Sequence, residues 1–196
     1  MKSFDLSVLL SLTLFFISSG CVNTPPREIF PDLRYSHFKP ISLAVNSVEI
    51  KVSYVSPKQM PNVEHKFPIV PTKAASNWLE DRIRASGGTD SLLATVTKGS
   101  VVEVELPRTP GLKGAFLVDQ SERYDGELEI VLEIIDPNGI RRAMVSSRAV
   151  RSKTVAEDST LSEREEIWFR ITEGMMNDLN AALEKQISKH FLIWRR

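Results

Sequence analysis

Three glutamates at alternate positions of one segment are the first candidates for chemistry. Glu127, Glu129 and Glu133 lie in the run ELEIVLEII and would share one face of a β-strand. A glycosidase acting on cell-wall polysaccharide needs two carboxyl groups several ångströms apart. The alternative is a solvated strand face whose charge is balanced by arginines of the next segment, Arg142, Arg148 and Arg151. We favour the solvated face, because alternating charge suits a sheet with one exposed side, and we expect no catalytic residue and no enzyme.

The three histidines offer no metal site. His37, His65 and His190 lie in three separate segments without a second ligand at a typical spacing. The sequence holds no GxSxG or HExxH motif and no phosphate-binding glycine loop. We therefore expect neither a metal nor a cofactor.

The only cysteine, Cys21, directly follows an apolar segment. Residues 6–17, LSVLLSLTLFFI, come after Lys2 and are followed by Ser18, Ser19 and Gly20. An apolar core of this length with small residues behind it is typical of a secretory signal peptide. It is shorter than the roughly 20 residues that cross a bilayer.

The segment ISSGC resembles the bacterial lipobox, in which cleavage before a cysteine leaves that residue acylated at the new amino terminus. It departs from the family in having Ser18 where Leu, Val or Ile is preferred. The resemblance implies cleavage between Gly20 and Cys21 and three acyl chains on Cys21. Attachment would then be effectively permanent, whereas one myristoyl chain binds a membrane only marginally. Val22 in place of the aspartate that retains enterobacterial lipoproteins at the inner membrane favours the outer membrane, facing the periplasm, with the inner membrane as the alternative.

The charge balance argues against nucleic acid as a partner. Twenty-five basic and 25 acidic residues give a formal net charge of zero. Phosphate-backbone binding needs a concentrated positive field. The membrane, through acylated Cys21, and another envelope protein are the partners that we expect.

The expected organisation is a signal peptide over residues 1–20, a lipidated cysteine with a proline-rich tether over 21–40, and a single domain over 41–194. The tether has four apolar residues that could dock on the domain, namely Ile29, Leu33, Tyr35 and Phe38. The expected fold is α+β, a mainly antiparallel sheet of about four strands with two helices on one face. A strand is predicted over 41–55 and another over 91–106, with Gly99 as its bulge. A helix is predicted from an N-cap at Thr72 to a terminator at Gly87, with exposed charges at Glu80, Asp81, Arg82 and Arg84.

The clearest strand alternates apolar residues with glutamates up to Ile134 and then meets the turn DPNG. Two registers stay open for this hairpin. Gly139 is left-handed and bulged in one, and a two-residue Pro137-Asn138 loop places Glu133 opposite Arg142 in the other.

A long amphipathic helix is predicted for the last segment. Ser162 and Glu165 have the spacing of a capping box at its start. The expected buried stripe consists of Ile167, Ile171, Met175, Leu179, Leu183 and Ile187.

Two candidate binding regions follow from exposed or soft apolar residues. The first is the loop 107–121, whose Leu112, Phe116 and Leu117 would contact a protein partner. The second is a groove for a lipid or small hydrophobic ligand, lined by Trp168, Met175 and Met176; the alternative, which we favour, places these three in the core. At the carboxy terminus, Phe191, Leu192, Ile193 and Trp194 either touch a membrane or another subunit, or seal the end of the helix.

The segments GAF at 114–116, Q-x-ERYD at 120–125 and ERE-x-x-W at 163–168 resemble an uncharacterised family of small outer-membrane lipoproteins of alphaproteobacterial type. The layout is also similar to auxiliary lipoproteins of envelope transport or assembly. The resemblance implies a fold and a location and carries over no catalytic residue. The expected function is a non-enzymatic binding or auxiliary subunit of the cell envelope; the alternatives are a lipid or hydrophobic-ligand binder and, less favoured, a cell-wall hydrolase.

Overall fold

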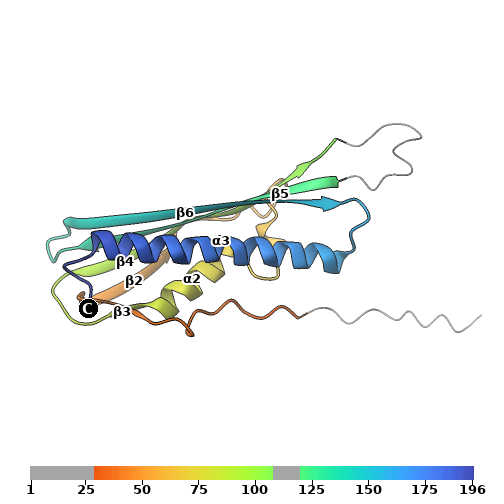
Figure 1. Cartoon of the computed structure of the whole chain (residues 1–196). Coiled ribbons are helices and arrows are strands. Elements are labelled where there is room, and N and C mark those ends of the chain that lie inside the picture. Colours follow the sequence, from red (N-terminus) through yellow and green to blue (C-terminus); the bar gives the residue numbers. More distant parts are fainter. Residues whose placement is uncertain (1–28, 108–119) are drawn as a thin grey trace, which may run out of the picture.

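A computed structural model of the chain describes residues 29–107 and 120–196 (Figure 1). The elements in chain order are β1 (Ile41–Leu43), β2 (Ser47–Val52), the 3-10 helix η1 (Glu64–Lys66), α2 (Pro71–Arg82), β3 (Ile83–Ala85), β4 (Ser91–Glu105), β5 (Gln120–Ile135), β6 (Arg141–Ala156) and α3 (Leu161–His190). The predicted signal peptide, and Gly20 and Cys21 with it, lie outside the described residues.

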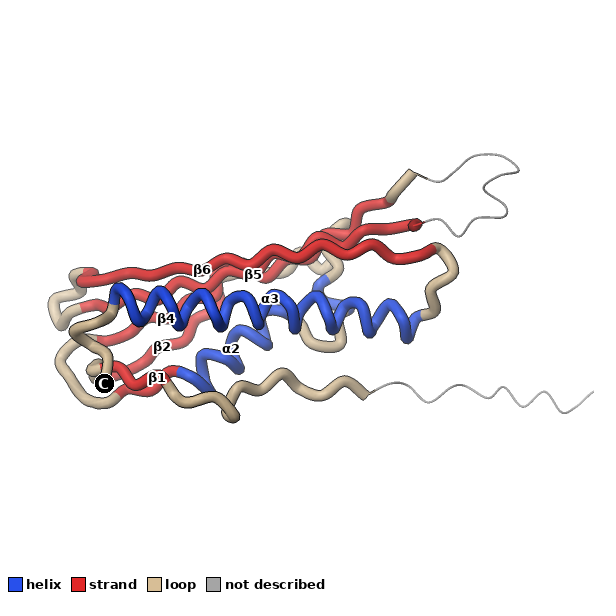
Figure 2. The backbone as a smooth tube through the Cα atoms, in the orientation of Figure 1, coloured by secondary structure: helices blue, strands red, loops and turns tan. Residues whose placement is uncertain are grey.

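The expected α+β class and the mainly antiparallel sheet are confirmed. Four strands form one sheet in the order β2-β4-β5-β6, in which only the β2–β4 pair is parallel. A second, two-stranded parallel sheet joins β1 to β3. Both long helices lie against the same side of the large sheet (Figure 2).

The strand predicted over 41–55 is divided between the two sheets. Ile41 pairs with Ile83 in the small sheet, whereas Ser47 pairs with Ser91 in the large one. The chain leaves one sheet for the other within residues 44–46, and strand propensity alone does not reveal that change of partner.

β5 follows the predicted alternation. Leu128, Ile130, Leu132 and Ile134 are fully buried, and the glutamates between them lie on the opposite face. At 16 residues each, β5 and β6 are roughly 53 Å long. The 30-residue α3 is about 45 Å long and so covers most of that length.

The hairpin adopts the first of the two open registers. Gly139 has a φ of +80°, and its N–H donates to the carbonyl of Asp136. The bulge shifts the pairing so that Glu133 faces Met144, and the alternative that placed Glu133 opposite Arg142 is wrong. The carboxylate of Asp136 also accepts from the N–H groups of Asn138 and Ile140, which stabilises the wider turn.

The boundaries of α2 differ from those predicted. The N-cap is Val70, with Pro71 in the first turn, so Thr72 lies inside the helix. The helix ends at Arg82 because Ile83 is extended and enters β3, and Gly87 lies beyond that strand. The bulge of β4 lies between Val96 and Lys98 rather than at Gly99.

The N-cap of α3 lies two residues earlier than predicted. Thr160 is the N-cap, its hydroxyl accepts from the N–H of Glu163, and the Glu163 carboxylate accepts from the Thr160 N–H at 2.7 Å. The capping box is therefore Thr160 with Glu163, and Ser162 and Glu165 lie within the helix. Apart from the half-buried Ile167, the predicted stripe is buried.

Candidate functional site

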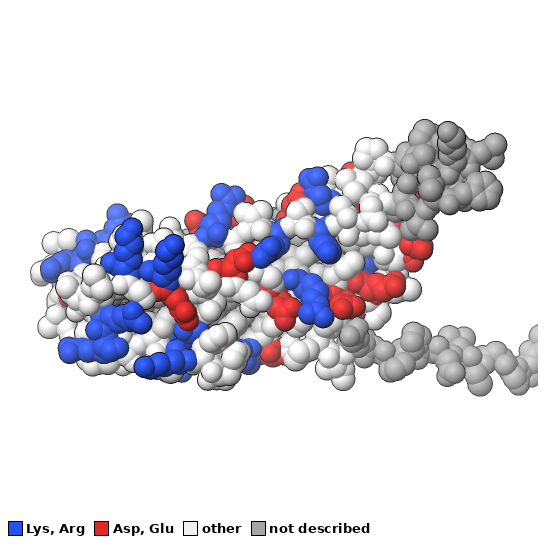
Figure 3. Space-filling model, in the orientation of Figure 1, with Lys and Arg blue, Asp and Glu red and all other residues white. Residues whose placement is uncertain are grey.

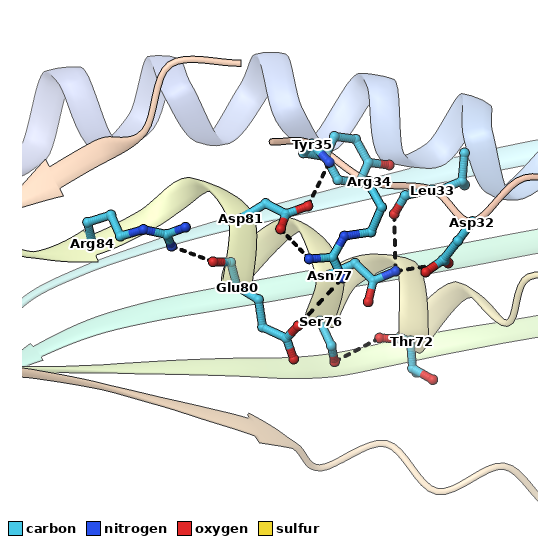
Figure 4. A network of polar contacts seen from close by, with 10 residues as sticks. All are labelled: Asp32, Leu33, Arg34, Tyr35, Thr72, Ser76, Asn77, Glu80, Asp81 and Arg84. Carbon is cyan, nitrogen blue, oxygen red and sulfur yellow. Dashed lines mark hydrogen bonds and ion pairs between the residues drawn. The ribbon is translucent and has the colours of Figure 1, made fainter. Parts of the chain in front are cut away.

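The segment before β1 is bonded to the face of α2, and two of the tether residues that offered contacts with the domain, Leu33 and Tyr35, pack in or against the core. Asn77 and Asp81 lie one turn apart on α2, and both side chains point toward this segment (Figure 4). We call residues 30–38 the docked segment. Because Tyr35 is only 6% exposed and belongs to the core, the packed body begins before residue 41.

Asp81 makes the central contacts of the docked segment. Its Oδ2 accepts from the backbone N–H of Tyr35 at 2.7 Å, and its Oδ1 pairs with the guanidinium of Arg34. Asp81 is 6% exposed, although the sequence placed it on the solvent face of the helix. A carboxylate of such low exposure needs hydrogen-bond donors of this kind.

Asn77 holds the preceding residues. Its Nδ2 donates to Oδ1 of Asp32 at 3.0 Å and to the carbonyl of Leu33 at 3.1 Å. Phe30 stacks on Phe169 of α3 with ring centroids 5.3 Å apart. The docked segment therefore contacts both helices at once.

Burial also fixes the protonation state of the tyrosine in this segment. Burial is the largest cause that raises the pKa of Tyr35, and the nearby carboxylates of Glu173, Asp32 and Asp81 raise it further. The phenol is neutral at any physiological pH.

The candidate groove residues are part of the core. Met175 and Met176 are fully buried and Trp168 nearly so. The Trp168 ring stacks on Phe67 with centroids 5.3 Å apart and meets Tyr124 edge-on. Both adjacent methionines are covered because α3 is contacted from two sides. The sheet packs on one side, and residues 63–70 and α2 pack on another. The hydroxyl of Thr172 on α3 donates to the carbonyl of Ile69 on that second side. The candidate partner residues Leu112, Phe116 and Leu117 lie outside the described residues.

The three strand glutamates each have a partner across the sheet. Glu127 pairs with Arg148 and Glu133 with Arg141, both at 2.9 Å, and Glu129 accepts from the hydroxyl of Thr97 at 2.7 Å. Of the predicted counter-charges, Arg151 instead pairs with Asp178 of α3. These contacts are those of a solvated, charge-balanced sheet face.

At the carboxy-terminal end, the four apolar residues divide into two pairs. Phe191 and Trp194 are buried, and the Trp194 indole donates to Asp90 at 2.8 Å, so they seal the end of α3. Leu192 and Ile193 are exposed.

Within residues 29–107 and 120–196, no group of histidines, cysteines and carboxylates has the arrangement of a metal site. No helix among the same residues is long and apolar enough to cross a bilayer.

Sequence reasoning considered docking through the apolar residues of the tether but missed the polar contacts that α2 makes with it. On α2 the local signal is the pair Asn77 and Asp81, spaced one turn apart beside Ala74 and Trp78 on a face that is otherwise apolar. Buried polar residues at that spacing call for partners, but the partners lie more than 40 positions away in a segment without periodicity.

No protein-family model matches the sequence, and no curated protein is significantly similar to it. Among solved structures, the chain is similar to a minor lipoprotein from Acinetobacter baumannii, with 13% identity and a TM-score of 0.40 over 74% of this chain and 92% of the other. It is also similar to a DUF330 protein from Xanthomonas campestris, with 10% identity and a TM-score of 0.33 over 76% and 98% of the two chains. A candidate lipoprotein from Caulobacter crescentus has 11% identity and a TM-score of 0.29 over 70% and 90%. At these levels of identity and TM-score, the similarities assign the chain neither a family nor an activity.

Proposed function

We propose that this protein is a lipid-anchored lipoprotein of the bacterial cell envelope, attached through acylated Cys21 and facing the periplasm. On this proposal the body is a non-enzymatic binding or auxiliary subunit at the outer membrane. The sequence ISSGC and the short apolar segment before it support the anchor. The proposal rests most on one structural observation, the docking of residues 30–38 onto α2 and α3.

Docking limits how far the body can lie from its anchor. Cys21 precedes Ile29 by eight residues, which span at most about 29 Å when fully extended. A tether that was free up to residue 40 would reach more than twice as far. The docked segment therefore keeps the body close to the bilayer that holds the acyl chains.

The sheet face offers little to a hydrolase. Each candidate glutamate already binds an arginine or a hydroxyl, so its carboxylate oxygens are occupied by contacts within the sheet. The same face is suited to contact with a protein, since Met144 and Val150 of β6 are exposed among the charges.

Strand addition at β6 is the mode of partner binding that we favour. β6 pairs with β5 on one side, and among the described residues no strand pairs with its other edge. Such an edge presents unpaired backbone groups over 16 residues.

Crosslinking in intact cells tests this function. A photoreactive amino acid at Val150 should capture one envelope protein, whereas the same group at Val55, an exposed loop residue, should not. Absence of a discrete product from Val150, or identical products from both positions, contradicts the proposed binding role.

A further inference from the structure

A cavity of about 240 Å³ lies at the end of the molecule where the carboxy terminus is found. Four separate segments build it: the residues before and within β1, the end of α2, the last turns of α3, and the tail. The tail is fixed there because the N–H of Arg196 donates to the carbonyl of Ser42 and that of Ala44 to the carbonyl of Trp194. The cavity is thus a product of the folded chain and not of one flexible surface segment.

Four cations line this cavity, namely Lys39, Arg82, Arg195 and Arg196. The one acidic side chain in the lining, Glu184, is already paired with Arg82, and Arg196 carries the α-carboxylate at the end of the tail. Among the described residues, neither Lys39 nor Arg196 has a carboxylate within ion-pair distance. Figure 3 shows basic side chains gathered at this end of the molecule, although the whole chain is neutral.

Arg82 provides the strongest sign that the cavity is a binding site. Its side chain is 3% exposed, and Nη1 donates to Asn180 at 2.7 Å. Its Nε–H is buried and has no hydrogen-bond partner among the described residues. Buried polar groups are nearly always paired, so the guanidinium of Arg82, a residue that lines the cavity, lacks one acceptor.

The dipole of α3 explains only part of the positive charge around the cavity. Cations near the last turn of a helix stabilise its carbonyl end, and Lys189 serves that purpose. Lys39 and Arg196 belong to other segments and converge on the cavity instead. Ile41 and Ile187 give the same cavity an apolar wall.

We propose that this cavity binds a phosphate group, carried by a soluble molecule or by a lipid headgroup. The planar fork of arginine matches phosphate oxygens, and lysine adds a point charge. The net positive lining suits a group of one or two negative charges, and the apolar wall leaves room for a glycerol-sized substituent. The site does not depend on acylation of Cys21, so it can fail or succeed independently of the proposed anchor.

The test uses the full chain in a mild non-ionic detergent and two probes, inorganic phosphate and glycerophosphoglycerol, the deacylated headgroup of phosphatidylglycerol. Each is titrated while the Nε–H resonance of Arg82 is followed by NMR. We expect a saturable shift of that resonance. We also expect at least a tenfold weaker affinity in the double variant Lys39→Ala/Arg196→Ala, and tighter binding in Glu184→Gln because a repelling charge is removed.

The matched control is Lys51→Ala/Arg142→Ala, which removes two exposed cations of the large sheet and has the same net charge as the cavity variant. It should bind as the wild type does. If glycerophosphoglycerol, a phosphodiester, binds at least as tightly as inorganic phosphate, the phosphate group that the cavity binds belongs to a lipid headgroup. If glycerophosphoglycerol binds more weakly, the ligand is free phosphate or a soluble phosphomonoester. The proposal is overturned if neither probe shifts the resonance, or if both double variants lose affinity equally.

Discussion

The backbone N–H of Tyr35 donates a 2.7 Å hydrogen bond to the carboxylate of Asp81, which joins a segment outside the sheets to the last turn of α2. Asp81 also pairs with Arg34. With Asn77, which binds Asp32 and Leu33, this side chain holds the docked segment on α2.

Replacing Asp81 by alanine should lower the free energy of unfolding by about 1–3 kcal/mol, because the Tyr35 N–H would remain buried without an acceptor. Urea unfolding measures the change, and limited proteolysis should show faster cleavage near residue 35. Glu80→Ala is the control. Glu80 contacts Arg34 at 3.7 Å on the surface, so its loss should change stability by less than about 0.5 kcal/mol. Equal effects of the two variants would refute the assigned role of Asp81.

Glu64 should make stability depend on acidic pH. It is fully buried. Burial alone would raise its pKa, but hydrogen bonds from Ser56, Tyr54 and the Val101 N–H together outweigh burial and lower it below 4.5. The folded state then binds fewer protons than the unfolded state, so this contribution is present above about pH 4.5 and is lost as the pH falls through the folded-state pKa.

The measurement is the free energy of unfolding of wild type and Glu64→Gln between about pH 3 and pH 7. The variant should be less stable near neutral pH and lose less stability on acidification. Glu49→Gln, an exposed change on β2, should keep the wild-type slope. A Glu64→Gln curve parallel to that of the wild type would show that Glu64 is not the titrating group.

The capping residue of α3 can be identified by mutation. Thr160→Ala should destabilise the protein by about 1 kcal/mol, since the first turn loses the acceptor of the Glu163 N–H. Ser162→Ala should destabilise the protein less than Thr160→Ala, because Ser162 lies inside the helix and not at its cap. Thermal unfolding followed by circular dichroism compares them, and the reverse order of the two effects would move the cap to the residue that the sequence pattern suggested.

The position of Met175 distinguishes a core from a ligand groove. Met175→Ala should cost about 2–5 kcal/mol, because it opens a cavity among fully buried side chains. Met144→Ala, on the exposed face of β6, should change stability by less than about 0.5 kcal/mol. A Met175→Ala variant whose stability was nearly unchanged and that no longer bound lipid would contradict the core assignment and support the ligand groove.

Regular elements with a strong period were predictable from sequence, and long-range contacts were not. The alternation of Leu128 to Ile134 and the stripe of α3 reflect one buried face each, so the pattern alone identifies β5 and α3. The cap of α3 was misplaced because both Thr160 with Glu163 and Ser162 with Glu165 satisfy the same spacing. Which of them is used depends on where β6 ends.

The polar contacts of the docked segment, and the cavity, could not be predicted for a different physical reason. Asp81 and Arg82 look like solvated helix charges, and both are buried only because residues 30–38 and Asn180 of α3 lie against them. The parallel pairing of β2 with β4 is likewise set by a connection of 38 residues. Local sequence does not identify such distant partners.

The most direct test of the central claim is metabolic labelling with an alkyne-bearing fatty acid, comparing wild type with Cys21→Ala in the native bacterium. The proposal predicts a labelled wild-type chain that sediments with the outer membrane and whose mature amino-terminal peptide begins at acylated Cys21. It predicts an unlabelled Cys21→Ala chain. A wild-type chain that carries no label, or that keeps its first twenty residues, would contradict the lipid anchor.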